Sequence, residues 1–273
     1  MPVVTPNVSL ENQFRTSRDN GKKLLVPYVT GGLTSDWIDV VRAIADAGAD
    51  AIEIGIPFSD PIMDGPVIQE ASQRALDRGI TPQSIFRDVA AAQVEQRFEI
   101  PLVAMTYVNV AAHAGWTKFA SQLGAAGFSG AILPDLPSGE AHDWSEAMTT
   151  VGLAAVQLVA PTTPDERITK IAEMSRGFVY AVGTMGVTGE RSKLAESALT
   201  LARRVKALTN RPVLVGVGVS TPAQAAEVAA VADGVIVGSA MVRRLLDVGD
   251  SGGGAKAAAA FVGELRRALD RVS

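Results

Sequence analysis

The chain has 273 residues, of which 47% are hydrophobic and 20% charged, a profile typical of a soluble globular protein with a sizeable core. Its formal charge of -4 comes without any basic run, which argues against nucleic acid or an anionic membrane as a partner. The absence of cysteine excludes disulfides, thiolate nucleophiles and zinc-thiolate sites, and without a signal segment or a long apolar run we expect a cytoplasmic protein.

The chain alternates between apolar, β-branched runs and stretches with helical spacing. Residues 7–21 predict a helix that precedes the first strand. Strands are predicted to begin near Leu24, Ala51, Leu102, Gly130, Ala155, Phe178, Val213 and Gly234. Eight such units in about 250 residues favour a closed parallel barrel over an open sheet. We therefore expect an α/β fold in which residues 1–273 form a single-domain (β/α)8 TIM barrel with an additional N-terminal helix.

The second predicted strand contains a carboxylate within an apolar run. Alternation along a strand places Ile52 and Ile54 on one face and Glu53 on the other, beside the small Ala51 and Gly55. A buried carboxylate must be paired, neutralised or used in chemistry, because its desolvation costs several kcal/mol. The sequence alone leaves open the alternative that Glu53 has a structural role and is paired with a base that is distant in the sequence.

The loop after this strand carries two further carboxylates, Asp60 and Asp64. Both stand in good turn sequences, Ser59-Asp60-Pro61 and Asp64-Gly65-Pro66, so either could simply organise a turn. For Asp64 a catalytic role is favoured, since a second carboxylate near Glu53 would allow proton transfer at two places on one substrate.

Other candidate residues follow the later strands. Tyr107 and Tyr180 end the third and sixth strands, where either could line a pocket or close the top of the barrel. The segment from Gly183 to Arg191 contains three glycines, which predict a mobile loop at the same end. The two histidines indicate no site, so we expect no metal.

Two glycine-bearing turns follow the last two strands. Gly216-Val217-Gly218 precedes one predicted helix, and Gly238-Ser239 opens the next. Backbone N–H groups at helix starts bind anions, and the loops after strands seven and eight are the usual phosphate site of such barrels. The first turn lacks the third glycine of a dinucleotide fingerprint, so a phosphate ester is favoured over a dinucleotide.

These motifs together resemble one family, the tryptophan synthase alpha subunit. The resemblance spans nearly the whole chain and rests on Gly55-x-Pro57-Phe58-Ser59-Asp60-Pro61-x-x-Asp64-Gly65-Pro66-x-Ile68-Gln69, Pro134-Asp135-Leu136-Pro137, Gly186-Val187-Thr188-Gly189 and Gly238-Ser239-Ala240. It implies a barrel that cleaves indole-3-glycerol phosphate to indole and glyceraldehyde 3-phosphate in tryptophan biosynthesis. It also implies a beta subunit partner in an alpha2beta2 complex, with pyridoxal phosphate in the partner and no cofactor in this chain.

The resemblance also implies roles for single residues. Glu53 matches the family's general acid/base, and Asp64 matches the carboxylate that acts at the indole nitrogen. We expect a raised pKa for Glu53 in its apolar strand and an ionised Asp64 on its polar loop. The substrate-binding residues would be Tyr107, Tyr180, Thr188, Gly189, Gly218, Gly238 and Ser239. Thr188 lies in the family's closing loop, and Asp60 is expected to contact the partner.

Four places depart from the commonest pattern of the family: Gly31-Gly32-Leu33, Met63, Gly183 and Val217. None removes a proposed catalytic group, although together they bear on the fit of the pocket to indole and on the details of the partner surface. A stand-alone lyase that releases free indole would share every catalytic residue named above. Another phosphosugar enzyme on this barrel and a regulatory subunit that has lost catalysis are the remaining alternatives.

Overall fold

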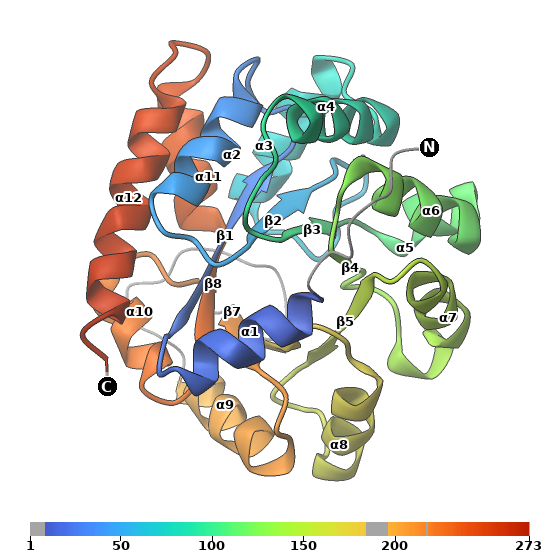
Figure 1. Cartoon of the computed structure of the whole chain (residues 1–273), viewed down its shortest axis with the longest axis vertical. Coiled ribbons are helices and arrows are strands. Elements are labelled where there is room, and N and C mark those ends of the chain that lie inside the picture. Colours follow the sequence, from blue (N-terminus) through green and yellow to red (C-terminus); the bar gives the residue numbers. More distant parts are fainter. Residues whose placement is uncertain (1–8, 184–195, 217, 273) are drawn as a thin grey trace.

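The computed structural model of the chain describes residues 9–183, 196–216 and 218–272. Its centre is a closed barrel of eight strands, each hydrogen-bonded in parallel to the next (Figure 1). The strands are β1 Leu24–Thr30, β2 Ile52–Gly55, β3 Leu102–Met105, β4 Gly130–Ile132, β5 Ala154–Val159, β6 Val179–Val182, β7 Val213–Gly216 and β8 Gly234–Val237. Pairing of β1 with β8, in the register Leu24 with Gly234, closes the barrel. The predicted (β/α)8 barrel is confirmed.

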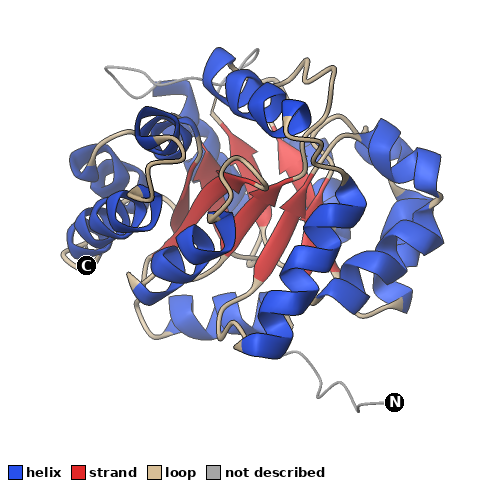
Figure 2. Ribbon diagram, turned by 90° about the horizontal axis from the view of Figure 1, so that it is seen from above, coloured by secondary structure: helices blue, strands red, loops and turns tan. Residues whose placement is uncertain are grey.

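Helices surround the barrel on the outside, as Figure 2 shows from above. They are α2 Trp37–Asp46, α3 Pro66–Asp77, α4 Pro82–Glu95, α5 Val108–Ala114, α6 Trp116–Ala126, α7 His142–Thr150, α8 Asp165–Met174, α9 Glu196–Leu208, α10 Pro222–Ala229, α11 Ser239–Val248 and α12 Gly254–Leu269, with a short 3-10 turn at Ser138–Glu140. No helix in the described ranges is both long and apolar enough to cross a membrane.

The first helix, α1 (Leu10–Asp19), closes the N-terminal end of the barrel. Its Leu10 and Phe14 are completely buried and belong to the core inside the barrel, where the Phe14 ring lies 5.7 Å from that of Phe178. Glu11 forms an ion pair of 2.5 Å with Arg211, which precedes β7. The predicted N-terminal helix therefore seals one end, and only the C-terminal end remains available for a substrate.

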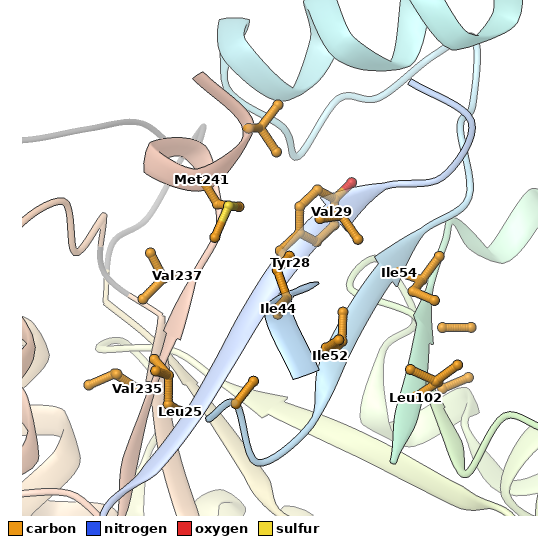
Figure 3. Packing of buried hydrophobic residues seen from close by; sticks show 14 of the residues in the cluster. Leu25, Tyr28, Val29, Ile44, Ile52, Ile54, Leu102, Val235, Val237 and Met241 are labelled. Atoms are coloured by element: carbon orange, nitrogen blue, oxygen red, sulfur yellow. The ribbon is translucent and has the colours of Figure 1, made fainter. Parts of the chain in front are cut away.

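The alternation predicted for β2 is present. Ile52 and Ile54 pack into the layer between the barrel and its helices, together with Leu102 of β3 (Figure 3). Ala51 belongs to the core inside the barrel, and Glu53 faces the same side. The apolar face of β2 is therefore stabilised by helix packing, and this leaves its other face free to carry a polar group.

Two buried aspartates hold the N-terminal ends of the strands. Asp50 accepts a hydrogen bond from the backbone N–H of Leu25 at 2.8 Å and pairs with Arg266 of α12 at 3.1 Å. Asp233 repeats the arrangement, with the N–H of Val213 at 2.8 Å and Lys206 at 2.6 Å. Because they lie at the end opposite the pocket, their role is structural.

Candidate active site

A cavity of about 500 Å³, which includes its open mouth, lies at the C-terminal end of the barrel. Six residues singled out from the sequence line it: Glu53, Asp64, Tyr180, Gly218, Gly238 and Ser239. The other lining residues are Tyr28, Ile68, Met105, Gly216 and Ile236. Strands β2 and β6 to β8 thus bring residues that are far apart in the chain to one pocket.

Glu53 is deeply buried in this pocket. Its side chain is 1% exposed, and its Oε2 atom has no hydrogen-bond partner among the described residues. Within the same ranges no lysine or arginine forms an ion pair with it, so the alternative of a structural pair finds no support there. Burial, and secondarily the charge of Asp64, raises the pKa of Glu53 to about 8. At neutral pH Glu53 therefore holds a proton that it can transfer.

Asp64 lies at the end of the loop that leads into α3. The Tyr107 hydroxyl donates a hydrogen bond of 3.0 Å to its Oδ2 atom and accepts one of 3.0 Å from the backbone N–H of Met63. Burial raises the pKa of Asp64 to about 6, and the Tyr107 hydrogen bond opposes that rise. At pH 7 Asp64 is therefore mainly ionised while Glu53 is mainly protonated, a division suited to two different roles.

The two predicted tyrosines differ in position. Tyr180 lines the main cavity, and its ring lies so close to β7 that a Cβ atom on Gly216 would be 2.5 Å from the hydroxyl oxygen. Tyr107 lines a smaller adjoining cavity, where its ring lies 5.3 Å from that of Phe58. Tyr107 therefore reaches the main pocket through Asp64, a contact that the sequence did not indicate.

Two helix starts, those of α10 after β7 and α11 after β8, are predicted to bind an anion, and the start of α11 is better suited to it. Ser239 starts α11, whose first turn has no side-chain cap. By contrast, the Thr221 hydroxyl accepts the N–H of Gln224 in a capping box at the start of α10. A Cβ atom on Gly238 would meet only Tyr28, at an ordinary 3.9 Å, so the protein itself leaves room there. Free N–H donors and open space at α11 suit a phosphate group.

Tyr28 is a pocket residue that the sequence reasoning missed. It stands in the apolar run Leu24-Leu25-Val26-Pro27-Tyr28 and carries no motif of its own. In the barrel it pairs in register with Glu53. Residues two apart in a strand face the same side, so Tyr28 shares a face with Leu24 and Val26, which point into the barrel. This alternation is the sequence signal that could have identified Tyr28.

Several predicted residues lie elsewhere. Asp60 is exposed on the loop after β2 and does not line the cavity. Thr188, Gly189 and Val217 lie outside the described residues. Within the described ranges, no group of three or more histidine, aspartate or glutamate side chains could hold a metal ion.

The departures at Gly31 and Gly32 have structural reasons outside the cavity. A Cβ atom on Gly31 would lie 2.4 Å from Ile85, and Gly32 has a positive φ of 73° and packs against Ile80. Met63 is 40% exposed on the loop surface, so its side chain is turned to solvent. These positions therefore affect helix packing and the surface rather than the cavity wall.

The fold and this pocket define a class: a (β/α)8 barrel with a pair of buried carboxyl groups and an open helix start in one pocket at the C-terminal end of the strands. The family model described as tryptophan synthase alpha chain matches residues 14–269. The alpha chain of Streptomyces avermitilis is 42% identical over 262 residues, covering 95% of this chain and 94% of that protein. The alpha chain of Thermobifida fusca is 45% identical over 246 residues, with coverages of 88% and 90%.

Solved structures give the same result. A structure of Mycobacterium tuberculosis tryptophan synthase matches with a TM-score of 0.85 and 40% identity, covering 96% of this chain and 99% of that one. The alpha chain from Legionella pneumophila matches with a TM-score of 0.85 and 32% identity, covering 97% and 98%. The chain belongs to the tryptophan synthase alpha chain family, a family of lyases in tryptophan biosynthesis. The resemblance predicted from the motifs is confirmed.

Proposed function

We propose that this chain cleaves indole-3-glycerol phosphate into indole and glyceraldehyde 3-phosphate, with Glu53 and Asp64 as the catalytic residues. The observation that carries the proposal is the pair of carboxyl groups with separated pKa values, about 8 and about 6, in one pocket with the open start of α11. Retention of both carboxyl groups in the pocket argues against a regulatory subunit that has lost catalysis.

The bond between indole C3 and the adjacent carbinol carbon must break. Protonated Glu53 delivers its proton to C3, which leaves positive charge on the ring nitrogen, and the Asp64 carboxylate stabilises that charge. The Glu53 carboxylate then takes the proton of the carbinol hydroxyl, whose oxygen becomes the aldehyde oxygen. The electron pair of the broken bond returns to the ring and restores indole, so Glu53 ends protonated and the atoms balance.

Binding of the phosphate is assigned to the backbone at Gly238 and Ser239, together with Gly218, which lines the same cavity. Gly218 has a φ of 71°, a conformation that favours glycine and turns the backbone at the end of β7. Tyr180 completes the wall of the pocket. Family membership supports the proposed roles of two further residues. Thr188 belongs to a loop proposed to close over the carboxylates, and Gly189 is proposed to contact the phosphate.

The proposal includes a beta chain that binds at the mouth of the pocket. The loop after β2 presents Asp60 together with Ile62, 73% exposed, and Met63, which is unusual exposure for large apolar side chains. In the proposed alpha2beta2 assembly this loop contacts the beta chain, which carries the pyridoxal phosphate. We also propose that the whole chain is one domain, because α12 packs on α2 and so ties its end to its beginning.

Steady-state cleavage of indole-3-glycerol phosphate, with and without a beta chain, tests the proposal. We expect weak cleavage by the chain alone and an increase of about 10-fold or more with the partner, equivalent to about 1.4 kcal/mol of coupling. Asp64→Asn should lower turnover by about 100-fold, since an amide does not offset charge on the ring. Full activity of the wild type alone would indicate a stand-alone lyase, and no cleavage under either condition would reject the proposal.

A further inference from the structure

Tyr28 lies between the two ends of the pocket. Its strand β1 is bonded to β8 on one side and to β2 on the other. Toward β8, the Cβ position of Gly238 is 3.9 Å from the Cβ atom of Tyr28. Toward β2, Tyr28 stands in register with Glu53. A ligand that joins the start of α11 to Asp64 must therefore pass over Tyr28.

The ring of Tyr28 extends along β1 toward its C-terminal end, with the hydroxyl outermost (Figure 3). It lies across Gly55, where a Cβ atom would be 1.8 Å from the hydroxyl oxygen and 2.4 Å from Cζ. Any side chain on residue 55 would displace the ring, so glycine there is needed to place the hydroxyl at this level of the pocket. Tyr28 lines both the main cavity and the smaller one beside it.

This hydroxyl is not used to hold the catalytic carboxyl groups. The Oδ2 atom of Asp64 takes its hydrogen bond from Tyr107, and the Oε2 atom of Glu53 has no partner among the described residues. Burial, followed by the charge of Asp64, raises the pKa of Tyr28 well above its ordinary value of 10. The phenol therefore keeps its proton at physiological pH and remains available as a donor to a ligand.

We infer that the Tyr28 hydroxyl binds the glycerol hydroxyl that does not react, the one on the carbon next to the phosphate-bearing carbon; this inference rests on the proposed function. The three-carbon chain of the substrate links the phosphate to the indole ring and so lies over β1. One of its hydroxyls, beside the ring, loses its proton to Glu53. The other hydroxyl lies at the level of β1, from which Tyr28 contributes its side chain to the lining of the cavity. Tyr28 then selects for the glycerol diol over a chain that lacks this hydroxyl.

Equilibrium binding to two ligands tests this inference. One ligand is indole-3-glycerol phosphate, and the other is the same ester with hydrogen in place of the non-reacting hydroxyl. All titrations use the full chain with Glu53→Gln, so that neither ligand is cleaved. Adding Tyr28→Phe should weaken binding of the diol by about 5- to 10-fold and change binding of the deoxy ligand by less than about 2-fold, because only the diol loses a hydrogen bond.

Tyr107→Phe is the matched control, since it also removes one phenolic hydroxyl beside Asp64 but should alter the two dissociation constants by the same factor. Thermal unfolding of each variant checks folding. An equal loss of affinity for both ligands on Tyr28→Phe, or no loss for either, would overturn the inference. A shifted pH profile of turnover when Tyr28→Phe is made in the otherwise wild-type chain would also overturn it, because such a shift would mean that the Tyr28 hydroxyl acts on the Glu53 carboxyl group. The wild-type cleavage assay decides the proposed function separately.

Discussion

The Tyr107 hydroxyl donates a hydrogen bond of 3.0 Å to Oδ2 of Asp64 and is itself fixed by the backbone N–H of Met63. Tyr107 follows β3 as the N-cap residue of α5, and Asp64 lies near the end of the loop after β2, so the contact joins neighbouring βα units. It holds the Asp64 carboxylate in one orientation and opposes the rise in its pKa that burial causes. Because Met63 is partly exposed, the same contact links the surface of the loop to the proposed catalytic carboxylate.

Tyr107→Phe removes this hydrogen bond while keeping the ring against Phe58. The pKa of Asp64 should then rise above about 6, since the opposing contribution is lost and burial remains. In the proposed mechanism cleavage needs ionised Asp64, so the acid side of the pH–turnover profile should move to higher pH, and turnover at pH 6 should fall more than turnover at pH 7.5. An acid limb at the wild-type position would show that Tyr107 does not control Asp64.

Glu53→Gln keeps the shape of the side chain and removes the transferable proton. Turnover of indole-3-glycerol phosphate should fall by about 100-fold or more, with the dissociation constant of the substrate changed much less. Single-turnover measurements at saturating substrate separate the two quantities. Near-normal turnover would eliminate Glu53 as the acid/base.

The same substitution should change how stability depends on pH. The folded-state pKa of Glu53, about 8, lies above its unfolded value of 4.5, so the folded state holds this proton more tightly. Stability from this group is complete below pH 4.5 and is lost as the pH rises toward 8, by up to about 1.4 kcal/mol per pH unit. As the pH rises from 5 to 7, the free energy of unfolding of the wild type should fall by about 2 to 3 kcal/mol more than that of Glu53→Gln.

Urea unfolding of both proteins at pH 5, 6, 7 and 8 measures that difference. The slope with pH is the informative quantity, because the amide of glutamine also changes the absolute free energy of unfolding. Asp64 is present in both proteins and serves as the internal control. Parallel profiles would mean that Glu53 is not desolvated in the folded state.

Gly238→Ala tests the phosphate site. A Cβ atom there would make only a 3.9 Å contact with Tyr28, and Gly238 has a negative φ of -97°, so the added methyl group should fit within the protein without a clash. A bound phosphate would meet the new methyl group, and we expect binding of inorganic phosphate or substrate to weaken by about 10-fold. Gly139→Ala, at an exposed turn with nothing within 4 Å of the added atom, is the matched control. An unchanged affinity in Gly238→Ala would show that the phosphate binds at another place in the protein.

The sequence by itself determined the barrel and the inward position of Glu53. Strand periodicity alone separates Glu53 from Ile52 and Ile54, because side-chain direction in a strand depends only on local geometry. The turn chemistry before α3 and α11 is also local, and with the motif after β2 it sufficed to identify the family.

Only the tertiary structure decided how the groups of the pocket act on one another. Tyr28 and Glu53 become neighbours through the register of β1 and β2, and Tyr107 reaches Asp64 across 43 residues of chain. The separation of the two carboxyl pKa values depends on burial and on that hydrogen bond. Register, burial and long-range hydrogen bonds arise when the barrel closes, and no local pattern encodes them.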